Sequence, residues 1–319
     1  MTDVSAFAAD VLAGLTTTPR RLPSRWFYDE AGSRLFQEIM ATPEYYLTEA
    51  EAEIFRDCAA DIVAATGVSG TLDLIELGAG DGSKTRYLID GFLGAGINLT
   101  YRPIDISSSA LSGLATLVRT TWPDMPFAPI NDDYFVALEQ LGRAESTSAV
   151  RRLVLFPGAN IGNFTPAEAT EMLCAIRELL RPGDLLLTGF DLKKNPATIL
   201  AAYNDAAGKT AAFNLNLLAR INHELGGSFA LDHWHHWETY NPVTGAARSF
   251  LVCEADQQVW IEHLGRRFDF AAHEAIAVEI SQKYSLPELT QLAAQTGFDV
   301  VRDFTDRGEY FVDALWRRR

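Results

Sequence analysis

The chain has 319 residues, of which 48% are hydrophobic and 22% are charged, and its formal net charge is −15 at pH 7. These proportions are typical of a globular protein with a substantial core in one large or two modest domains. The negative charge would repel a phosphate backbone and no apolar run approaches roughly 20 residues, so we expect a small-molecule partner, no nucleic acid and no membrane.

From about residue 50, short apolar runs alternate with helical patterns. We predict strands at residues 72–77, 99–104, 126–130, 153–156 and 184–190, with helices near 82–94, 107–120, 134–142 and 166–180. This alternation is typical of βαβ units, which build a parallel sheet covered by helices on both faces. Ligands of such sheets lie beyond the carboxyl ends of the strands.

After residue 190 the pattern changes. We predict one long helix over 197–225, then antiparallel strands over 229–240, 248–254, 257–263 and 278–284, with a hairpin turn at "NPVTGA". A helix over 286–296 and strands over 298–304 and 310–316 would return to the parallel sheet. The sequence therefore predicts an α/β domain of residues 50–194 with 284–319, and a second lobe of residues 195–283 with 1–49.

The stretch "ELGAGDGS" follows the first predicted strand and precedes a helix. Its glycines have the spacing G-x-G-x-G, whereas dinucleotide-binding loops have G-x-G-x-x-G, and no P-loop frame precedes Lys84. The acids Glu76 and Asp81 would oppose a pyrophosphate at a helix N-terminus. They would suit a ligand with a positively charged end, so we predict S-adenosylmethionine (SAM) as the cofactor.

Carboxylates also follow the next two strands. Asp105 follows the second strand, where an acid can accept both ribose hydroxyls of a nucleotide. After the third strand, Asp133 would meet an adenine amino group and Tyr134 would flank the ring; alternatively, both acids would cap the next helices. The predicted cofactor-binding residues are Gly78, Gly80, Lys84, Asp105, Asp133, Tyr134 and Gly158.

Six strings together resemble the bacterial histidine-specific methyltransferases. They are "RWFYDEAGSRLF", "TPEYYLTEAE", "LGAGDGSKTRYLI", "PGANIGNFTP", "AYNDAAGKTAAFNLNLL" and "VEISQKYS". The resemblance covers about residues 22–316 and implies a Rossmann-like class I SAM-dependent methyltransferase sheet with an inserted α+β substrate-binding lobe. It also implies trimethylation of the α-amine of L-histidine, which gives hercynine in the first step of ergothioneine biosynthesis.

The same resemblance implies residues that bind the backbone of the substrate. Asn163 would bind the α-carboxylate and the amine, and Tyr203 would donate a hydrogen bond to the same carboxylate. Tyr28 would lie near the reacting amine, Tyr45 near the imidazole, and Phe213 beside the methyl-transfer space. We predict Tyr28 and Asn163 as the catalytic residues that orient the amine. Without the family, the tyrosines would equally be packing aromatics.

Glu279 and Ser281 would hold the imidazole ring by the same resemblance. A buried carboxylate facing an imidazole N–H would penalise side chains that lack this donor. Ser249 departs from the family, because the mycobacterial-type enzyme has a methionine beside the ring at this position. The smaller residue leaves strict histidine specificity open. The alternatives are a methyltransferase for another amino acid such as tryptophan, or a non-catalytic SAM-binding protein.

The predicted chemistry is in-line transfer of a methyl group to a neutral amine, for which the enzyme mainly aligns the reacting atoms. We identify no dedicated general base. The product is a quaternary ammonium, which the aromatic rings of Phe36, Tyr28 and Phe213 would tolerate through cation–π contact.

Histidines and cysteines do not form a metal-binding pattern. In "DHWHHW", His233 and His235 would share a strand face, but no further ligand set is spaced around them, so we predict no metal. The three cysteines, Cys58, Cys174 and Cys253, are far apart in the sequence, and we expect free thiols in a monomeric protein of the reducing cytoplasm.

Overall fold

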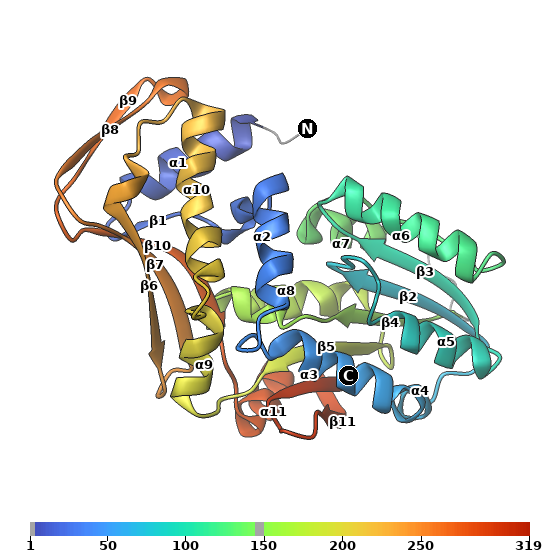
Figure 1. The fold of residues 1–319 in the computed structure, drawn as a ribbon. Helices are drawn as coiled ribbons and strands as arrows, with labels where there is room; N and C mark the ends of the chain where they lie inside the picture. The colour runs from blue at the N-terminus through green and yellow to red at the C-terminus, as the bar shows by residue number, and fades with distance from the viewer. Residues whose placement is uncertain (1–3, 144–149) are drawn as a thin grey trace. The chain divides into compact units, whose positions relative to one another are not determined.

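The computed structural model describes residues 4–143 and 150–319 (Figure 1). They divide into two compact units. The sheet unit consists of Leu47–Lys193 and Gln282–Arg319, and the lobe unit consists of Met1–Tyr46 and Lys194–Ser281. The predicted bounds, 50–194 with 284–319 and 1–49 with 195–283, differ from these by a few residues; the ligand of each unit stays a prediction.

The sheet unit contains a six-stranded sheet in the order β11-β12-β5-β4-β2-β3. Strands β3, β2, β4 and β5 are parallel, and β12 is antiparallel to both β5 and β11. This arrangement confirms the predicted Rossmann-like sheet and its closing hairpin. The bounds are β2 Thr71–Leu77, β3 Asn98–Ile104, β4 Val150–Phe156, β5 Leu185–Asp191, β11 Phe298–Thr305 and β12 Phe311–Arg318.

The predicted strand 126–130 is present only as an extended edge segment. Two isolated parallel bridges, at Phe127 and Ile130, join it to β3, and the Ala128 and Ile130 N–H groups donate to β3 carbonyls at 2.9 Å. Pro129 has no N–H to offer to a further strand, which suits it to the edge of a sheet.

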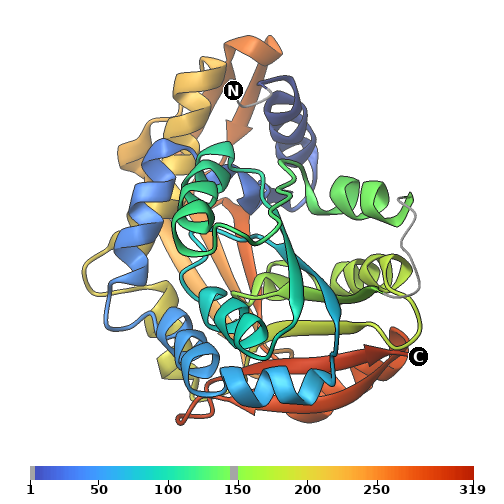
Figure 2. The same ribbon diagram turned by 90° about the vertical axis from the view of Figure 1, so that its right-hand side faces the viewer.

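Helices cover both faces of this sheet (Figure 2). Every residue of β5 is buried, as expected for a central strand with both faces covered. Thr165 and Glu168 form a capping box at the start of α8. The bounds are α3 Leu47–Asp57, α4 Ala59–Thr66, α5 Arg86–Gly94, α6 Ser108–Thr121, α7 Tyr134–Arg143, α8 Pro166–Leu179 and α11 Leu286–Gln295.

The lobe unit contains a four-stranded sheet in the order β1-β10-β7-β6 and a separate β8-β9 hairpin. Strand β6 pairs with β7 through the predicted "NPVTGA" turn, whereas β1 runs parallel to β10. Strand β9 was not predicted. The bounds are α1 Val4–Thr16, β1 Arg20–Arg21, α2 Glu30–Met40, α9 Pro196–Tyr203, α10 Lys209–Leu225, β6 Trp234–Asn241, β7 Ala246–Cys253, β8 Gln257–Ile261, β9 Arg266–Phe270 and β10 Ala275–Gln282.

The single helix predicted over 197–225 is wrong, because the chain forms two helices, α9 and α10. The first helix ends at Tyr203, because Asn204 leaves the helical region with φ −150° and ψ 62°. Gly208, just before the second helix, has a left-handed φ of 70°. The Asp205 carboxylate accepts hydrogen bonds from the Lys209 N–H at 2.9 Å and the Thr210 N–H at 2.7 Å, so it caps the second helix. The helical periodicity of the sequence continues across this break and concealed it.

A buried ion pair anchors the end of β5 in the sheet unit. Lys283 Nζ lies 2.6 Å from Asp191 Oδ2, and neither side chain is exposed. The Tyr284 N–H also donates to the Asp191 carbonyl at 3.0 Å. The segment that leads into α11 is therefore held against β5 by both charge and main-chain hydrogen bonding.

We expect Lys283→Met to destabilise the protein by about 3–5 kcal/mol, because it leaves the buried Asp191 carboxylate without its ammonium partner. Urea unfolding of both proteins measures this change. The control is Arg302→Met, which removes an exposed pair with Asp61 (side chains 52% and 62% exposed) and should cost less than about 1 kcal/mol. Equal losses in the two variants would contradict this role of the buried pair.

Candidate functional site

The glycine loop after β2 is closely packed at its start and open in its middle. Gly78 and Gly80 have φ values of 73° and 55°, in the left-handed region that favours glycine. A Cβ on Gly78 would lie 2.5 Å from the Tyr134 hydroxyl, whereas a Cβ on Gly80 would meet nothing within 4 Å. The loop therefore packs on Tyr134 and leaves space at Gly80, at the carboxyl end of β2.

Asp105 lies beside this loop, at the end of β3. Its Oδ2 accepts a hydrogen bond from the Gly80 N–H at 3.1 Å, and its Oδ1 accepts one from the Ser107 N–H at 2.8 Å. The Asn131 amide donates to the Asp105 carbonyl at 2.8 Å. The structure thus joins the loops that follow the first two predicted strands and the edge segment, as the parallel-sheet prediction required.

Asp133 and Tyr134 have different surroundings. The Asp133 Oδ1 accepts from the Phe135 N–H at 3.0 Å and its carbonyl accepts from Ala137, so Asp133 caps α7, which is the alternative that the sequence left open. The Tyr134 ring packs against Phe156 with 5.7 Å between the centroids. The Tyr134 hydroxyl lies against the glycine loop at Gly78.

The prediction that Glu76 would face the positively charged end of a ligand was wrong. Its side chain is buried and accepts hydrogen bonds from the Thr85 and Tyr101 hydroxyls. Burial raises the pKa of the Glu76 carboxyl to about 7, although both hydroxyls and Lys84 act in the opposite direction. The exposed acid of the loop is Asp81, which accepts from the Ser83 N–H at 2.9 Å.

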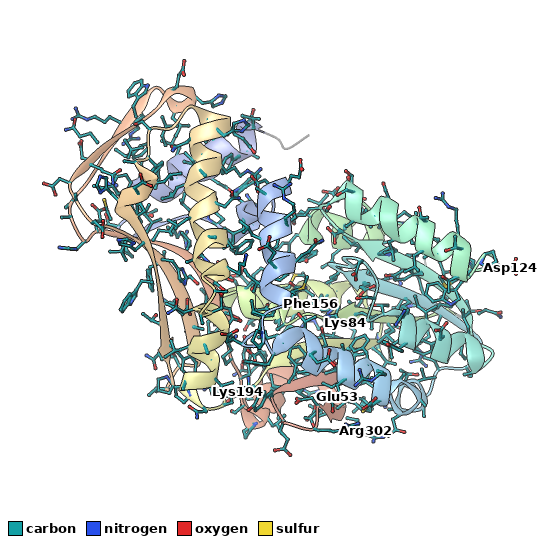
Figure 3. The ribbon with its side chains drawn as sticks, in the orientation of Figure 1. Glu53, Lys84, Asp124, Phe156, Lys194 and Arg302 are labelled. Carbon is teal, nitrogen blue, oxygen red and sulfur yellow. The ribbon has the colours of Figure 1, made fainter. Side chains whose placement is uncertain are left out.

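Lys84 and Gly158 are both held by one carboxylate that the sequence analysis missed. The fully buried Glu51 of α3 forms an ion pair with Lys84 (labelled in Figure 3) and accepts a hydrogen bond from the Gly158 N–H at 2.6 Å. A signal existed, since Glu51 occupies the apolar stripe of α3 between the buried Leu47 and Ile54. A charged residue in such a stripe indicates a buried partner.

These residues fit an adenosyl ligand with an amino acid end. Asp105 supplies a carboxylate for ribose hydroxyls, and the Lys84 ammonium suits the carboxylate of the amino acid end. The open space at Gly80 admits a ligand next to the main chain. The predicted cofactor residues Gly78, Gly80, Lys84, Asp105, Tyr134 and Gly158 all lie in the sheet unit, at the loops that follow its strands.

The lobe unit contains an aromatic cluster, which consists of Tyr28, Phe36, Tyr45, Tyr203 and Phe213. Ring centroids lie 5.5 Å apart for Tyr28 and Phe36, 5.6 Å for Tyr28 and Phe213, 6.1 Å for Phe36 and Tyr45, and 6.4 Å for Tyr45 and Tyr203. Tyr28 is 45% exposed, whereas Tyr203 and Phe213 are buried. The structure thus brings together the aromatic residues that the sequence predicted for the substrate.

Polar side chains continue from this cluster across the lobe sheet. The Tyr203 hydroxyl lies 2.7 Å from Ser281 Oγ. Ser249 Oγ lies 2.7 Å from Glu238 Oε2 and 3.0 Å from Glu279 Oε2. Glu238 was not predicted; its signal was its place in the alternating strand "WHHWETYN", where it is buried like Trp234.

Asn163 is the one predicted substrate residue that lies in the sheet unit. It ends the 3-10 helix Asn160–Asn163 that follows β4, and its side chain is exposed. The preceding Asn160 amide donates to the Pro157 carbonyl at 2.8 Å, which fixes the turn. The structure therefore places Asn163 at the carboxyl end of β4, and its role toward a substrate stays a prediction.

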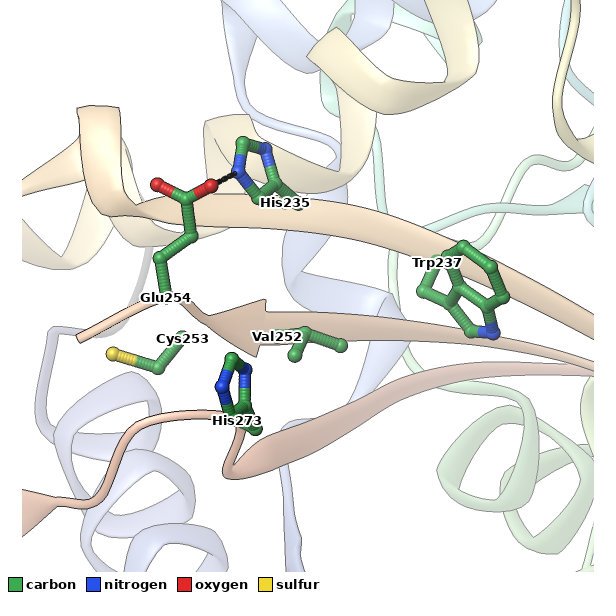
Figure 4. Close-up of a pocket in the computed structure, with 6 residues that line it drawn as sticks. All are labelled: His235, Trp237, Val252, Cys253, Glu254 and His273. Carbon is green, nitrogen blue, oxygen red and sulfur yellow. Dashed lines mark hydrogen bonds and ion pairs between the residues drawn. The ribbon is translucent and has the colours of Figure 1, made fainter. Parts of the chain in front are cut away.

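The outward face of the lobe sheet carries a separate shallow pocket of about 420 Å³ (Figure 4). His235 Nε2 bonds to the Glu254 carboxylate there, and both side chains are about half exposed. His233 lies farther from the same carboxylate, at 3.9 Å. Within residues 4–143 and 150–319, no group of three or more histidine, cysteine, aspartate or glutamate side chains is arranged to hold a metal ion.

Comparison with known proteins places this geometry in context. A family model described as "Histidine-specific methyltransferase, SAM-dependent" matches residues 7–318. Histidine N-alpha-methyltransferase of Mycolicibacterium smegmatis is 38% identical over 301 residues, which are 94% of this chain and 91% of the relative. The Mycobacterium tuberculosis protein of the same name is 36% identical over 306 residues, covering 96% and 93%.

A third relative is longer. Ergothioneine biosynthesis protein 1 of Schizosaccharomyces pombe is 31% identical over 290 residues, which are 89% of this chain and 37% of the relative. In the part of the chain that the structure describes, no helix is long and apolar enough to span a membrane.

The buried Glu76 carboxyl makes stability depend on pH. Its pKa is about 7 in the folded protein, against 4.5 for an exposed glutamate, so the folded state binds more protons between these values. Its contribution to stability therefore falls as pH rises from about 4.5 to 7, by about 3 kcal/mol. Urea unfolding from pH 4.5 to 8 should show a loss of stability that is about 3 kcal/mol larger in the wild type than in Glu76→Gln, in which other buried acids such as Asp313 still titrate. Parallel pH curves would contradict it.

Asp105→Ala should weaken SAM binding roughly 10- to 100-fold, because the variant loses a charged hydrogen-bond acceptor. Calorimetry with SAM measures this affinity. The SAM affinity of Asp105→Asn, which keeps one acceptor oxygen for the loop, should lie between those of Asp105→Ala and the wild type. The control Asp124→Ala removes an exposed carboxylate of the same unit and should leave the affinity unchanged. An unchanged affinity in Asp105→Ala would refute the assignment.

Proposed function

Because the chain belongs to the family of histidine-specific, SAM-dependent methyltransferases, we propose that it methylates the α-amine of L-histidine. Three successive transfers give hercynine, and the reaction is the first step of ergothioneine biosynthesis. The names of the mycobacterial relatives and of the longer fungal relative support this substrate and this pathway.

The observation that carries the choice of substrate is the Glu279 carboxylate in the lobe unit. Ser249 holds it at 3.0 Å, and Glu279 is only partly exposed on its strand. An imidazole N–H is a donor that such a carboxylate can accept. A side chain without this donor leaves the carboxylate desolvated and unpaired, which costs several kcal/mol. Selection for histidine follows from this penalty.

The aromatic cluster supports the remaining assignments. Tyr203, whose hydroxyl lies 2.7 Å from Ser281, is assigned to the substrate α-carboxylate, and Tyr45 to the imidazole. Tyr28 and Asn163 are assigned to orient the α-amine. The rings of Phe36, Tyr28 and Phe213 suit the growing positive charge of the methylated amine.

Methyl transfer to a neutral amine requires little acid–base catalysis from the protein. SAM supplies an electrophilic methyl group, and the α-amine must be neutral to expose its lone pair. The hydroxyl of Tyr28 and the amide of Asn163 orient the nitrogen by hydrogen bonding. Alignment of the reacting atoms then provides most of the acceleration.

The direct test incubates the protein with SAM and each amino acid in turn, followed by mass spectrometry for increments of one to three methyl groups. Increments on histidine alone support the proposal. Increments on tryptophan would replace it with the alternative of another amino acid substrate. SAM binding without any methylated product would indicate a non-catalytic SAM-binding protein.

We further propose that the protein acts as a monomer in the cytoplasm. The three free thiols of Cys58, Cys174 and Cys253 are suited to a reducing compartment. Sedimentation velocity and cell fractionation test the two parts of this proposal separately.

Glu279→Ala should raise the KM for histidine roughly 10- to 100-fold while leaving the affinity for SAM unchanged, because it removes a charged acceptor from the substrate only. Steady-state kinetics and calorimetry measure the two effects. The control Glu254→Ala removes an exposed carboxylate on the outward face of the same sheet and should change neither. Equal loss of histidine and SAM binding would refute the assignment of Glu279.

A further inference from the structure

One buried carboxylate fixes both a cation and a neighbouring main-chain turn in the sheet unit. Lys84, at the end of the glycine loop, forms an ion pair with Glu51 through Oε2. The other oxygen of Glu51, Oε1, accepts a hydrogen bond from the Gly158 N–H at 2.6 Å. The Glu51 side chain is 1% exposed, whereas that of Lys84 is 24% exposed. The ammonium is therefore held from the inside of the protein and remains accessible from the outside.

Two other acids act on the charge of Lys84 without holding it. Glu76 accepts its hydrogen bonds from two hydroxyl groups instead. Asp313 of β12 is fully buried, and within the described residues neither of its carboxyl oxygens has a hydrogen-bond partner. Burial and the charge of Glu51 raise the pKa of Asp313 well above its usual value, against the opposing effect of Lys84. Glu51 is therefore the acid that pairs with the ammonium.

A glycine on β5 leaves the space in which the Glu51 carboxylate lies. A Cβ on Gly189 would be 2.5 Å from Glu51 Oε1 and 2.9 Å from two carbons of the Phe311 ring. These separations are too short for non-bonded atoms, so a side chain at this position would displace the carboxylate or the ring. The position of Glu51, and through it that of Lys84, thus depends on the absence of a side chain at Gly189.

Lys84 keeps donors for a ligand after it has paired with Glu51. An ammonium group has three hydrogens, and among residues 4–143 and 150–319 its hydrogen-bond acceptor is Glu51. Burial by itself would lower the pKa of Lys84, but the Glu51 carboxylate raises it above its usual value. The group is therefore charged at neutral pH, and a charged donor binds a carboxylate more strongly than a neutral donor does.

We propose that Glu51 is a positioning residue that holds the Lys84 ammonium where it donates to the carboxylate of the amino acid end of SAM. The pair thereby selects a cofactor that carries this carboxylate. A purely structural role of Glu51 would instead weaken all adenosyl ligands alike. The inference rests on SAM as the cofactor and not on the identity of the methyl acceptor. Binding measurements therefore test it even if histidine is not the substrate.

Calorimetry with SAM and with decarboxylated SAM, which keeps the sulfonium and the amine, isolates the contribution of the carboxylate. Glu51→Gln should weaken SAM binding roughly 10- to 100-fold, because the neutral amide no longer holds the ammonium. Its affinity for decarboxylated SAM should stay within about three-fold of the wild type. The control Asp105→Ala should weaken both ligands by similar factors, because both contain the ribose. Equal losses of the two ligands in Glu51→Gln, or an unchanged SAM affinity, would overturn the proposal.

Gly189→Ala tests the position of the carboxylate without changing any charge. The added methyl group displaces Glu51 and should weaken SAM binding roughly 3- to 10-fold, with decarboxylated SAM within about two-fold. The matched control is Gly94→Ala at the end of α5, where a Cβ meets nothing within 4 Å, and it should change neither affinity. An unchanged SAM affinity in a folded Gly189→Ala protein would contradict the positioning role.

A double variant shows whether Glu51 acts through Lys84. Adding Glu51→Gln to Lys84→Met should change the SAM affinity by no more than about two-fold, because the group that Glu51 positions is already absent. A further loss as large as that of Glu51→Gln alone would overturn the proposal. The double variant contains neither charge of the pair, so it stays informative if a single variant fails to fold. Thermal unfolding of each variant identifies such a failure.

Discussion

The buried carboxylate of Glu51 is the constraint on which the candidate cofactor site depends. It joins three segments that are far apart in the sequence, because it belongs to α3, pairs with Lys84 after the glycine loop, and accepts from the Gly158 N–H after β4. A fully buried charge needs such partners, since each missing one leaves a desolvation cost of several kcal/mol. The two loops and α3 therefore hold one another in place.

Other carboxyl groups of this acidic chain are buried, and their protonation follows from their surroundings. Burial raises the pKa of Asp313 in β12 well above its usual value, and the nearby Glu51 adds to this shift. The pKa of Glu76 is raised for the same first reason, to about 7. The formal net charge of −15 counts every carboxyl group as ionised, so it overstates the negative charge of the folded protein.

The fold and the glycine loop were largely predictable because they depend on local patterns. Alternating apolar runs and helices specified the sheet, and the spacing after β2 excluded a dinucleotide loop. The predictions failed where a capping side chain overrode periodicity, as at Asp205 between α9 and α10. They also failed at Glu76, because a residue's position in a motif does not specify which way its side chain points.

By itself, the sequence determined the βαβ order and the lobe inserted between β5 and α11, because apolar periodicity and spacing specify these elements. The predicted site residues came from the resemblance of its motifs to the family. Only the tertiary structure decided which polar groups that are distant in the sequence contact one another. Glu51 contacts Lys84 across 33 positions, and Glu238 meets Ser249 and Glu279 on three different strands. Sheet pairing and burial create these contacts, and no local pattern encodes them.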